Sequence, residues 1–214
     1  TVNRTIILLT LTIASAAFTW NLPNESPFIL PLMLLGLIGG LITAIITIFK
    51  KEWAPVTAPI YVILEGLLLG AISSLMESIF PGIVIQAVAL TFGTLFCLLL
   101  AYKFKLIRAT ENFRLGVFAA TGAIALIYIV TLILNLFSIN MPYIHDSGMV
   151  GIGFSLFVVV IAALNLVLDF DFIEKGAENR VPKYMEWYAA FGLMVTLIWL
   201  YLEILRLLGK TRRR

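Results

Sequence analysis

The stretch that decides the fold is FILPLMLLGLIGGLITAIITIF, residues Phe28–Phe49, which contains no charged side chain. As a helix it is about 33 Å long, enough to cross the roughly 30 Å hydrocarbon core of a bilayer. The whole chain has the same character, because 61% of its 214 residues are hydrophobic and only 13% are charged. A soluble domain is roughly half apolar and about a quarter charged, so lipid is the expected solvent.

Six further stretches have the length and composition of a membrane-spanning helix. The seven predicted spans are Thr5–Trp20, Phe28–Phe49, Val56–Ile79, Ile83–Tyr102, Phe113–Ser138, Met149–Ile173 and Tyr184–Leu208. The connections between them are too short to hold a soluble domain. The sequence therefore predicts an all-α, polytopic membrane protein, a seven-transmembrane-helix bundle that forms a single domain over residues 1–214.

Glycines recur at helical spacing in several of these spans. They include Gly36, Gly39, Gly40, Gly66, Gly70, Gly116, Gly122, Gly151 and Gly153. Small residues let helix backbones approach closely in lipid, so we expect these positions to lie at helix–helix contacts.

The lysines and arginines predict the orientation of the chain. Ten of the fifteen lie before the first span or in the second, fourth and sixth loops: Arg4, Lys50, Lys51, Lys103, Lys105, Arg108, Arg114, Lys175, Arg180 and Lys183. Because cytoplasmic loops carry the excess of basic residues, we expect a cytoplasmic N-terminus. The other five are Arg206, Lys210, Arg212, Arg213 and Arg214. Seven spans put this tail outside, against the rule, so either the tail tolerates that position or the last segment crosses incompletely; its length favours a full crossing.

Two carboxylates lie near the cytoplasmic end of the sixth span. Asp169 and Asp171 are two residues apart, which turns their side chains about 200° from each other on a helix. We expect the deeper Asp169 to be buried and Asp171 to face the membrane interface. The alternative is that both are helix-end charges paired with Lys175 or Arg180.

Glu186 enters the seventh span from the same side of the membrane as Asp169. The two carboxylates can therefore lie close together, where they would bind a proton or a hard cation such as calcium. The alternative is an interfacial charge within an aromatic belt formed by Tyr184, Trp187 and Tyr188.

Glu65 lies about 13 Å into the third span, beside Gly66 and Gly70. A carboxylate at that depth must be protonated, paired or hydrated, so it is a candidate functional group, with a neutral, hydrogen-bonded structural role as the alternative. Glu203 and Arg206 are three residues apart near the outer end of the seventh span, and we expect a local ion pair.

No catalytic motif is visible in the sequence. There is no H-E-x-x-H zinc helix, no histidine within a span to activate a serine, no phosphate-binding loop and no dinucleotide fingerprint. The only histidine, His145, is expected in a loop. We therefore expect a protein that is not an enzyme, binds no nucleic acid and has no cofactor, with no metal site apart from calcium at Asp169.

Three stretches of the last two spans resemble the bacterial branch of the Bax inhibitor-1 (transmembrane Bax inhibitor motif) family. They are NLVLDFDFIE at residues 165–174, YMEWYAAFG at 184–192 and WLYLEILRLL at 199–208. The seven-span layout extends the resemblance to essentially the whole chain.

The resemblance implies six helices around a central seventh, a pH-sensitive calcium leak, and a place in the bacterial inner membrane. It implies a pair of aspartates, of which the first matches Asp169; an ungapped match places Thr196 at the second. The family's second-span acid falls near Gly36 and its latching arginine near Thr47, so these three positions depart from the pattern.

The leading expectation is a membrane cation leak or channel-like protein, most simply for calcium, made pH-sensitive by intramembrane carboxylates. The candidate ion-binding or gating residues are Asp169, Asp171, Glu65, Glu186 and Glu203. Its partners would be the lipid bilayer and the cation. The alternative is a non-transporting regulator that binds another membrane protein, such as a quality-control protease.

Overall fold

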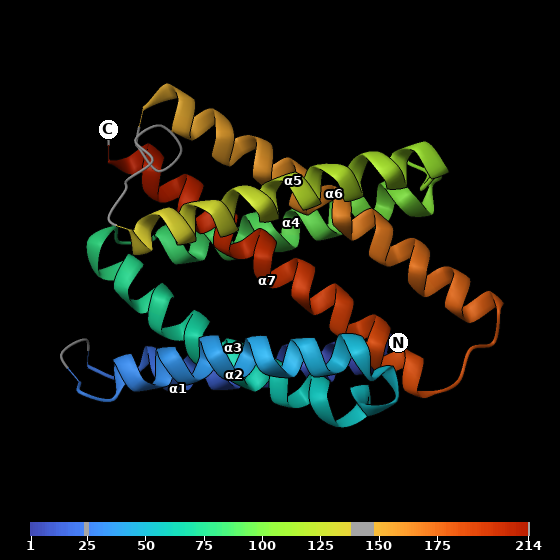
Figure 1. The fold of residues 1–214 in the computed structure, drawn as a ribbon, viewed down its shortest axis with the longest axis horizontal. Coiled ribbons are helices and arrows are strands. Elements are labelled where there is room, and N and C mark those ends of the chain that lie inside the picture. The colour runs from blue at the N-terminus through green and yellow to red at the C-terminus, as the bar shows by residue number, and fades with distance from the viewer. Residues whose placement is uncertain (24–25, 138–147, 214) are drawn as a thin grey trace. The chain divides into compact units, whose positions relative to one another are not determined.

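The computed structural model describes residues 1–23, 26–137 and 148–213. Within these ranges the chain forms seven α-helices and one short 3-10 helix (Figure 1). They are α1 (Val2–Trp20), α2 (Ile29–Phe49), η1 (Lys51–Trp53), α3 (Ala54–Ile79), α4 (Ile83–Lys103), α5 (Glu111–Leu136), α6 (Met149–Glu178) and α7 (Tyr184–Arg212). All seven α-helices are long and apolar enough to cross a membrane, which confirms the predicted fold class.

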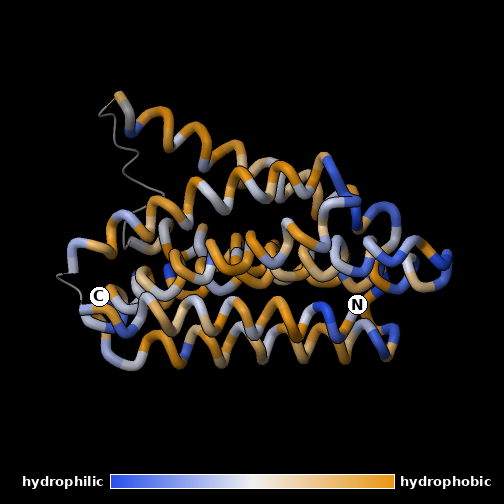
Figure 2. Tube along the Cα trace, turned by 90° about the horizontal axis from the view of Figure 1, so that it is seen from below, coloured by the Kyte–Doolittle hydropathy of each residue, from blue (hydrophilic) through white to orange (hydrophobic). Residues whose placement is uncertain are grey.

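The observed helix bounds follow the hydropathy pattern closely. Figure 2 shows hydrophobic residues along most of each helix and the strongest hydrophilic colour where helices end. The main difference is α6, which continues from the predicted end at Ile173 to Glu178. Nothing in these residues breaks a helix until Pro182, so the helix outlasts its apolar segment. The predicted loop that contains His145 lies outside the described residues.

The chain forms two compact units. Unit 1 comprises residues 1–84 and 172–195, and unit 2 comprises residues 85–171 and 196–214. Both α6 and α7 contribute residues to each unit. Helix α7 is the most buried of the described spans, with 61% of its apolar window buried, as expected of a helix with protein neighbours.

In unit 1, α3 packs against both α1 and α2, and Figure 1 shows the three helices side by side. Glycines allow this close approach. A Cβ atom at Gly70 would come within 2.1 Å of the Ala16 carbonyl oxygen of α1, and one at Gly36 within 2.6 Å of the Leu64 carbonyl oxygen. Across the α1–α3 contact, the Thr19 hydroxyl donates a 3.0 Å hydrogen bond to the Leu67 carbonyl.

The packing prediction was wrong for part of the glycine set. A Cβ atom at Gly116, Gly122 or Gly153 would meet no heavy atom within 4 Å. These glycines therefore face open space, and no close approach depends on them. The packed glycines and the open glycines have the same helical spacing in the sequence. They differ in whether another helix lies beside them, and the spacing cannot predict this.

Unit 2 has an apolar core between α5, α6 and α7. Ile124, Val158 and Ile161 are buried together, and the partly buried residues packed against them are Ala120, Tyr128, Phe154, Leu164 and Trp199. At one end of this unit, the Lys210 ammonium near the end of α7 lies 3.1 Å from the Gly151 carbonyl at the start of α6. Helix α7 thus extends along α6 to its first turn.

Candidate ion-binding site

Asp169 projects from the buried side of α6 in unit 2. Its neighbours Leu166, Val167 and Phe170 are all buried, so the apolar face of the helix carries this carboxylate into the protein interior. The Thr196 hydroxyl of α7 donates a hydrogen bond to it. The second carboxylate oxygen, Oδ2, is buried and accepts no hydrogen bond from any described residue. Buried carboxylate oxygens normally accept a hydrogen bond, so the Oδ2 atom of Asp169 is the candidate position for a bound ion.

Asp171 points to a different side of α6, as its spacing from Asp169 predicts. Its Oδ2 atom forms an ion pair and hydrogen bond with Arg114 from the first turn of α5. Both side chains are partly buried, at 15% and 32% exposure. Asp171 is thus a paired charge, but its partner here is Arg114 of α5 and not the expected Lys175 or Arg180, because local spacing does not reveal a partner on another helix. Asp171 thus joins α6 to α5, which leaves Asp169 as the stronger candidate for binding an ion.

Glu203 lies in the second half of α7 and is only 2% exposed. The predicted ion pair with Arg206 is confirmed, since the guanidinium lies 3.0 and 3.1 Å from the two carboxylate oxygens. The Tyr128 hydroxyl of α5 also donates to Glu203, at 2.8 Å, and accepts from Arg206 at 2.8 Å. This triangle satisfies the buried charge, while the Arg206 side chain remains 47% exposed.

Lys210 forms a third polar group in unit 2. Its ammonium donates to the Ser155 hydroxyl at 2.9 Å and to the Gly151 carbonyl at 3.1 Å, and the residue is only 8% exposed. Lysine is almost never this buried without partners. One feature of the sequence indicates that Lys210 is buried. Thr196, Glu203 and Lys210 are spaced seven residues apart, which places them on one face of α7.

The polar groups of unit 2 therefore follow one another along α7. Thr196 with Asp169 comes first, then Glu203 with Tyr128 and Arg206, then Lys210 with Ser155, at intervals of about 10 Å. The buried core contains Val158 and Ile161, which lie between Ser155 and Asp169 on α6, and Ile124, which lies one turn before Tyr128 on α5. A second polar contact flanks this core, where the Asn165 amide donates to the Thr121 hydroxyl at 2.8 Å.

Glu65 belongs to unit 1 and lies against α2. Its Oε1 atom is close to Gly40, where a Cβ atom would come within 2.7 Å of it. The carboxylate is half-buried, and no hydrogen bond joins it to a described residue. It therefore faces α2, whereas the adjacent Gly66 faces Ser15 of α1. Glu65 remains a candidate ion-binding group within unit 1.

Glu186 also belongs to unit 1 and lies at the start of α7. Its carboxylate is 44% exposed and pairs with the Thr1 amino group and with Arg4, both at 3.7 Å. Arg4 also lies over the Trp187 ring, 4.8 Å from its centroid. These contacts fit the interpretation of Glu186 as an interfacial charge within an aromatic belt. Its pairing with Asp169 stays a prediction.

Two positions at which the family pattern has charged residues are neutral and well packed here. Gly36 lies against Leu64 and Leu68 of α3. Thr47 is fully buried, and its hydroxyl shares a 2.7 Å hydrogen bond with the Thr57 hydroxyl of α3. A hydroxyl pair thus joins α2 to α3 where the resemblance would put a latching arginine.

The available oxygen ligands suit transient binding. No group of three or more histidine, cysteine, aspartate or glutamate side chains gathers in a metal-binding arrangement among the described residues. Asp169 and Thr196 together offer three side-chain oxygens, whereas calcium takes six to eight ligands. A calcium ion at Asp169 would therefore keep most of its water. Such a site can bind a cation and release it again, as conduction requires.

Comparison with known proteins places the chain in a family. It matches the family model described as Bax inhibitor 1 like over residues 1–213. Comparisons with curated proteins and with solved structures find no match. Because the family match spans nearly the entire sequence, and the seven apolar helices agree with it, the chain belongs to the Bax inhibitor 1 like family.

Proposed function

We propose that this protein is a cation leak, with calcium as its foremost ion, and that Asp169 is the site at which the ion binds. The observation that carries the proposal is the buried Oδ2 atom of Asp169, which accepts no hydrogen bond from a described residue. A carboxylate inside the membrane is costly unless it is protonated, hydrated or paired with a cation. A carboxylate that exchanges protons and cations passes through all three states: protonated, hydrated and paired with a cation.

The polar groups along α7 supply the rest of the proposed route. A cation moving along α6 from Asp169 toward Ser155 would pass the apolar core of Ile124, Val158 and Ile161. A hydrophobic constriction of this kind stops ions by excluding water. In the same part of unit 2, the charge of Glu203 is already balanced by Arg206. The described arrangement therefore corresponds to a closed state, and opening requires these side chains to separate.

Protons would regulate the leak through competition at Asp169. Calcium binds the ionised carboxylate, and a proton occupies the same oxygens, so the affinity for calcium falls as the pH is lowered. The flux should therefore decrease when the pH falls through the range in which Asp169 titrates. Asp171 is held by Arg114 and is not part of the proposed binding site.

The test is calcium flux into proteoliposomes that contain a calcium-sensitive dye, measured between about pH 5 and pH 8. Asp169→Asn keeps the side-chain shape and removes the charge, so we expect at least about a tenfold loss of flux, equivalent to about 1.4 kcal/mol, and a flatter pH profile. Glu178→Gln is the matched control, because Glu178 is an exposed carboxylate at the end of the same helix. Absence of flux at every pH, or equal effects of the two variants, would overturn the proposal.

A second candidate function is regulation of another membrane protein without transport. The observation in its favour is the open side of α5, where a Cβ atom at Gly116 or Gly122 would meet no described residue within 4 Å. Small residues of this kind let a neighbouring helix approach closely. If the proteoliposomes show no flux, recovery of a stable membrane partner from wild-type protein, lost in Gly116→Leu, would support this function.

A further inference from the structure

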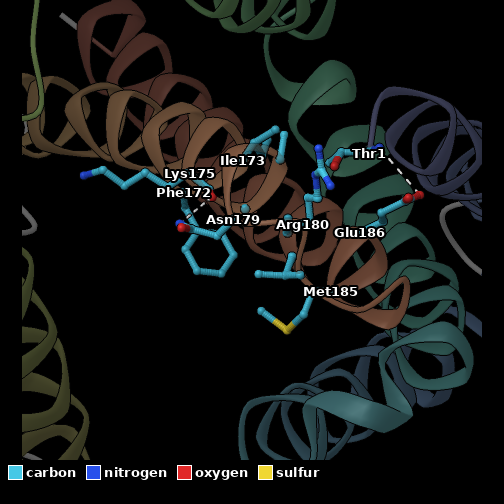
Figure 3. Close-up of a pocket in the computed structure, with 12 residues that line it drawn as sticks. Thr1, Phe172, Ile173, Lys175, Asn179, Arg180, Met185 and Glu186 are labelled. Atoms are coloured by element: carbon cyan, nitrogen blue, oxygen red, sulfur yellow. Dashed lines mark hydrogen bonds and ion pairs between the residues drawn. The ribbon is translucent and has the colours of Figure 1, made fainter.

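Unit 1 contains a pocket of about 410 Å³ at the junction of α6 and α7. Phe172, Val181 and Met185 give it apolar walls, and Lys175, Arg180 and Glu186 give it charge. Figure 3 shows these side chains, with Arg180 extending toward Thr1 and Glu186, and Lys175 extending away from them. The pocket therefore combines an apolar wall with a basic end.

The length of α6 places this pocket at the membrane surface. Its thirty residues span about 45 Å, some 15 Å more than a hydrocarbon core of about 30 Å. The apolar part of α6 comes first, so the excess lies at the end that carries Lys175. Aromatic contacts mark the boundary: the Phe172 ring lies 6.1 Å from the Tyr188 ring. The pocket thus spans the level of the aromatic belt and the lipid headgroups.

The Arg180 guanidinium is the positively charged group of this pocket that is available to bind a ligand. Its side chain is exposed and forms no ion pair with a described residue. Its backbone has a φ of +48°, a left-handed conformation that is uncommon for an arginine. Glu186 is the only carboxylate of the lining, and it is engaged by Thr1 and Arg4. A negatively charged ligand beside Arg180 therefore meets a net positive surface.

We propose that this pocket binds the phosphate of an anionic phospholipid headgroup. Arginine donates two parallel hydrogen bonds to a phosphate, and basic pockets between membrane helices at the headgroup level bind anionic lipids. A free phosphate ion shares the first feature. The apolar wall of Phe172, Val181 and Met185 favours the lipid, because it lies where the glycerol and the first acyl carbons would extend.

The experiment is native mass spectrometry of the purified full-length chain in detergent, titrated separately with phosphatidylglycerol, phosphatidylethanolamine, phosphatidylcholine and inorganic phosphate. We expect phosphatidylglycerol to bind at least about tenfold more tightly than the two zwitterionic lipids, and Arg180→Gln to remove that preference. Arg180→Lys should retain part of it. Lys105→Gln is the matched control, because Lys105 is an exposed basic loop residue that also has a positive φ, of +58°.

Each other outcome overturns the proposal. Equal binding of the charged and zwitterionic lipids would exclude recognition of an anionic headgroup. Equal competition by inorganic phosphate would show that the apolar wall plays no part. Equal losses in Arg180→Gln and Lys105→Gln would reduce the effect to general surface charge. Because binding is read directly, the result is independent of whether the protein conducts calcium.

Discussion

At the scale of single residues, the feature that matters most is the contact between Asp169 and Thr196. The hydroxyl satisfies one carboxylate oxygen and leaves the other without a described partner. Thr196 occupies the position at which the family resemblance implies a second aspartate. The resemblance therefore implies that the chain has one acid of the pair, with a neutral hydrogen-bond donor in place of the other.

Thr196→Asp should bring a second carboxylate to Asp169. Two facing carboxylates offer four oxygens to a cation, so we expect calcium to half-saturate the flux at about a tenfold lower concentration, with a steeper dependence on pH. Proteoliposome flux against calcium concentration measures this. Thr196→Asn supplies the control, since it adds similar volume without charge; identical behaviour of the two variants would show that charge at this position has no role.

At the scale of helices, α2 and α3 are held together by glycine contacts that differ from the open glycines elsewhere. Gly36→Ala would place a Cβ atom 2.6 Å from a backbone oxygen of α3, which cannot rotate away. We expect a loss of about 1–3 kcal/mol in the free energy of unfolding. Gly93→Ala, where the added atom meets nothing within 4 Å, should be neutral or up to about 1 kcal/mol more stable.

Thermal unfolding of the two alanine variants in the same detergent separates these cases. The Gly36 variant should melt below the wild-type protein and the Gly93 variant at or above it. If both variants shifted the melting temperature in the same direction by the same amount, the close packing of α2 on α3 would not be the cause.

Helix α7 contains an ion pair in which the buried Glu203 depends on the half-exposed Arg206. Removal of Arg206 leaves the Glu203 carboxylate, 2% exposed, with only the Tyr128 hydroxyl. We expect Arg206→Met to cost about 2 kcal/mol or more, and Glu203→Gln combined with Arg206→Met to recover most of that loss. A double-mutant cycle of unfolding free energies measures the coupling. Strict additivity of the single changes would contradict it.

The sequence predicts these helices well because each of them is an almost unbroken apolar run. It also predicts the pair of Glu203 and Arg206, since residues three apart share a helix face. The partners Arg114, Tyr128 and Ser155 could not be predicted in this way. Each lies more than fifty residues from the group it contacts, and the packing of separate helices determines which ones meet.

At the scale of the whole molecule, we predict that seven crossings put residues 1 and 213 on opposite sides of the membrane. Reporter fusions test this directly. A fluorescent protein that matures only in the cytoplasm should be active when fused within residues 104–110 or 179–183, and a reporter active only outside should work after residue 81 and after residue 213. A C-terminal fusion that fluoresces in the cytoplasm would contradict the full crossing of α7.

The burial of Lys210 has a consequence for how the protein is made. A segment with basic residues at its trailing end resists translocation, because positive charge favours the cytoplasmic side. The groups that hold the Lys210 ammonium, Ser155 and Gly151, belong to α6, which leaves the ribosome earlier. We therefore expect placement of the seventh helix to require the sixth already in the bilayer. In that order of insertion, Ser155 and Gly151 are in place to bind the Lys210 ammonium when α7 docks on α6.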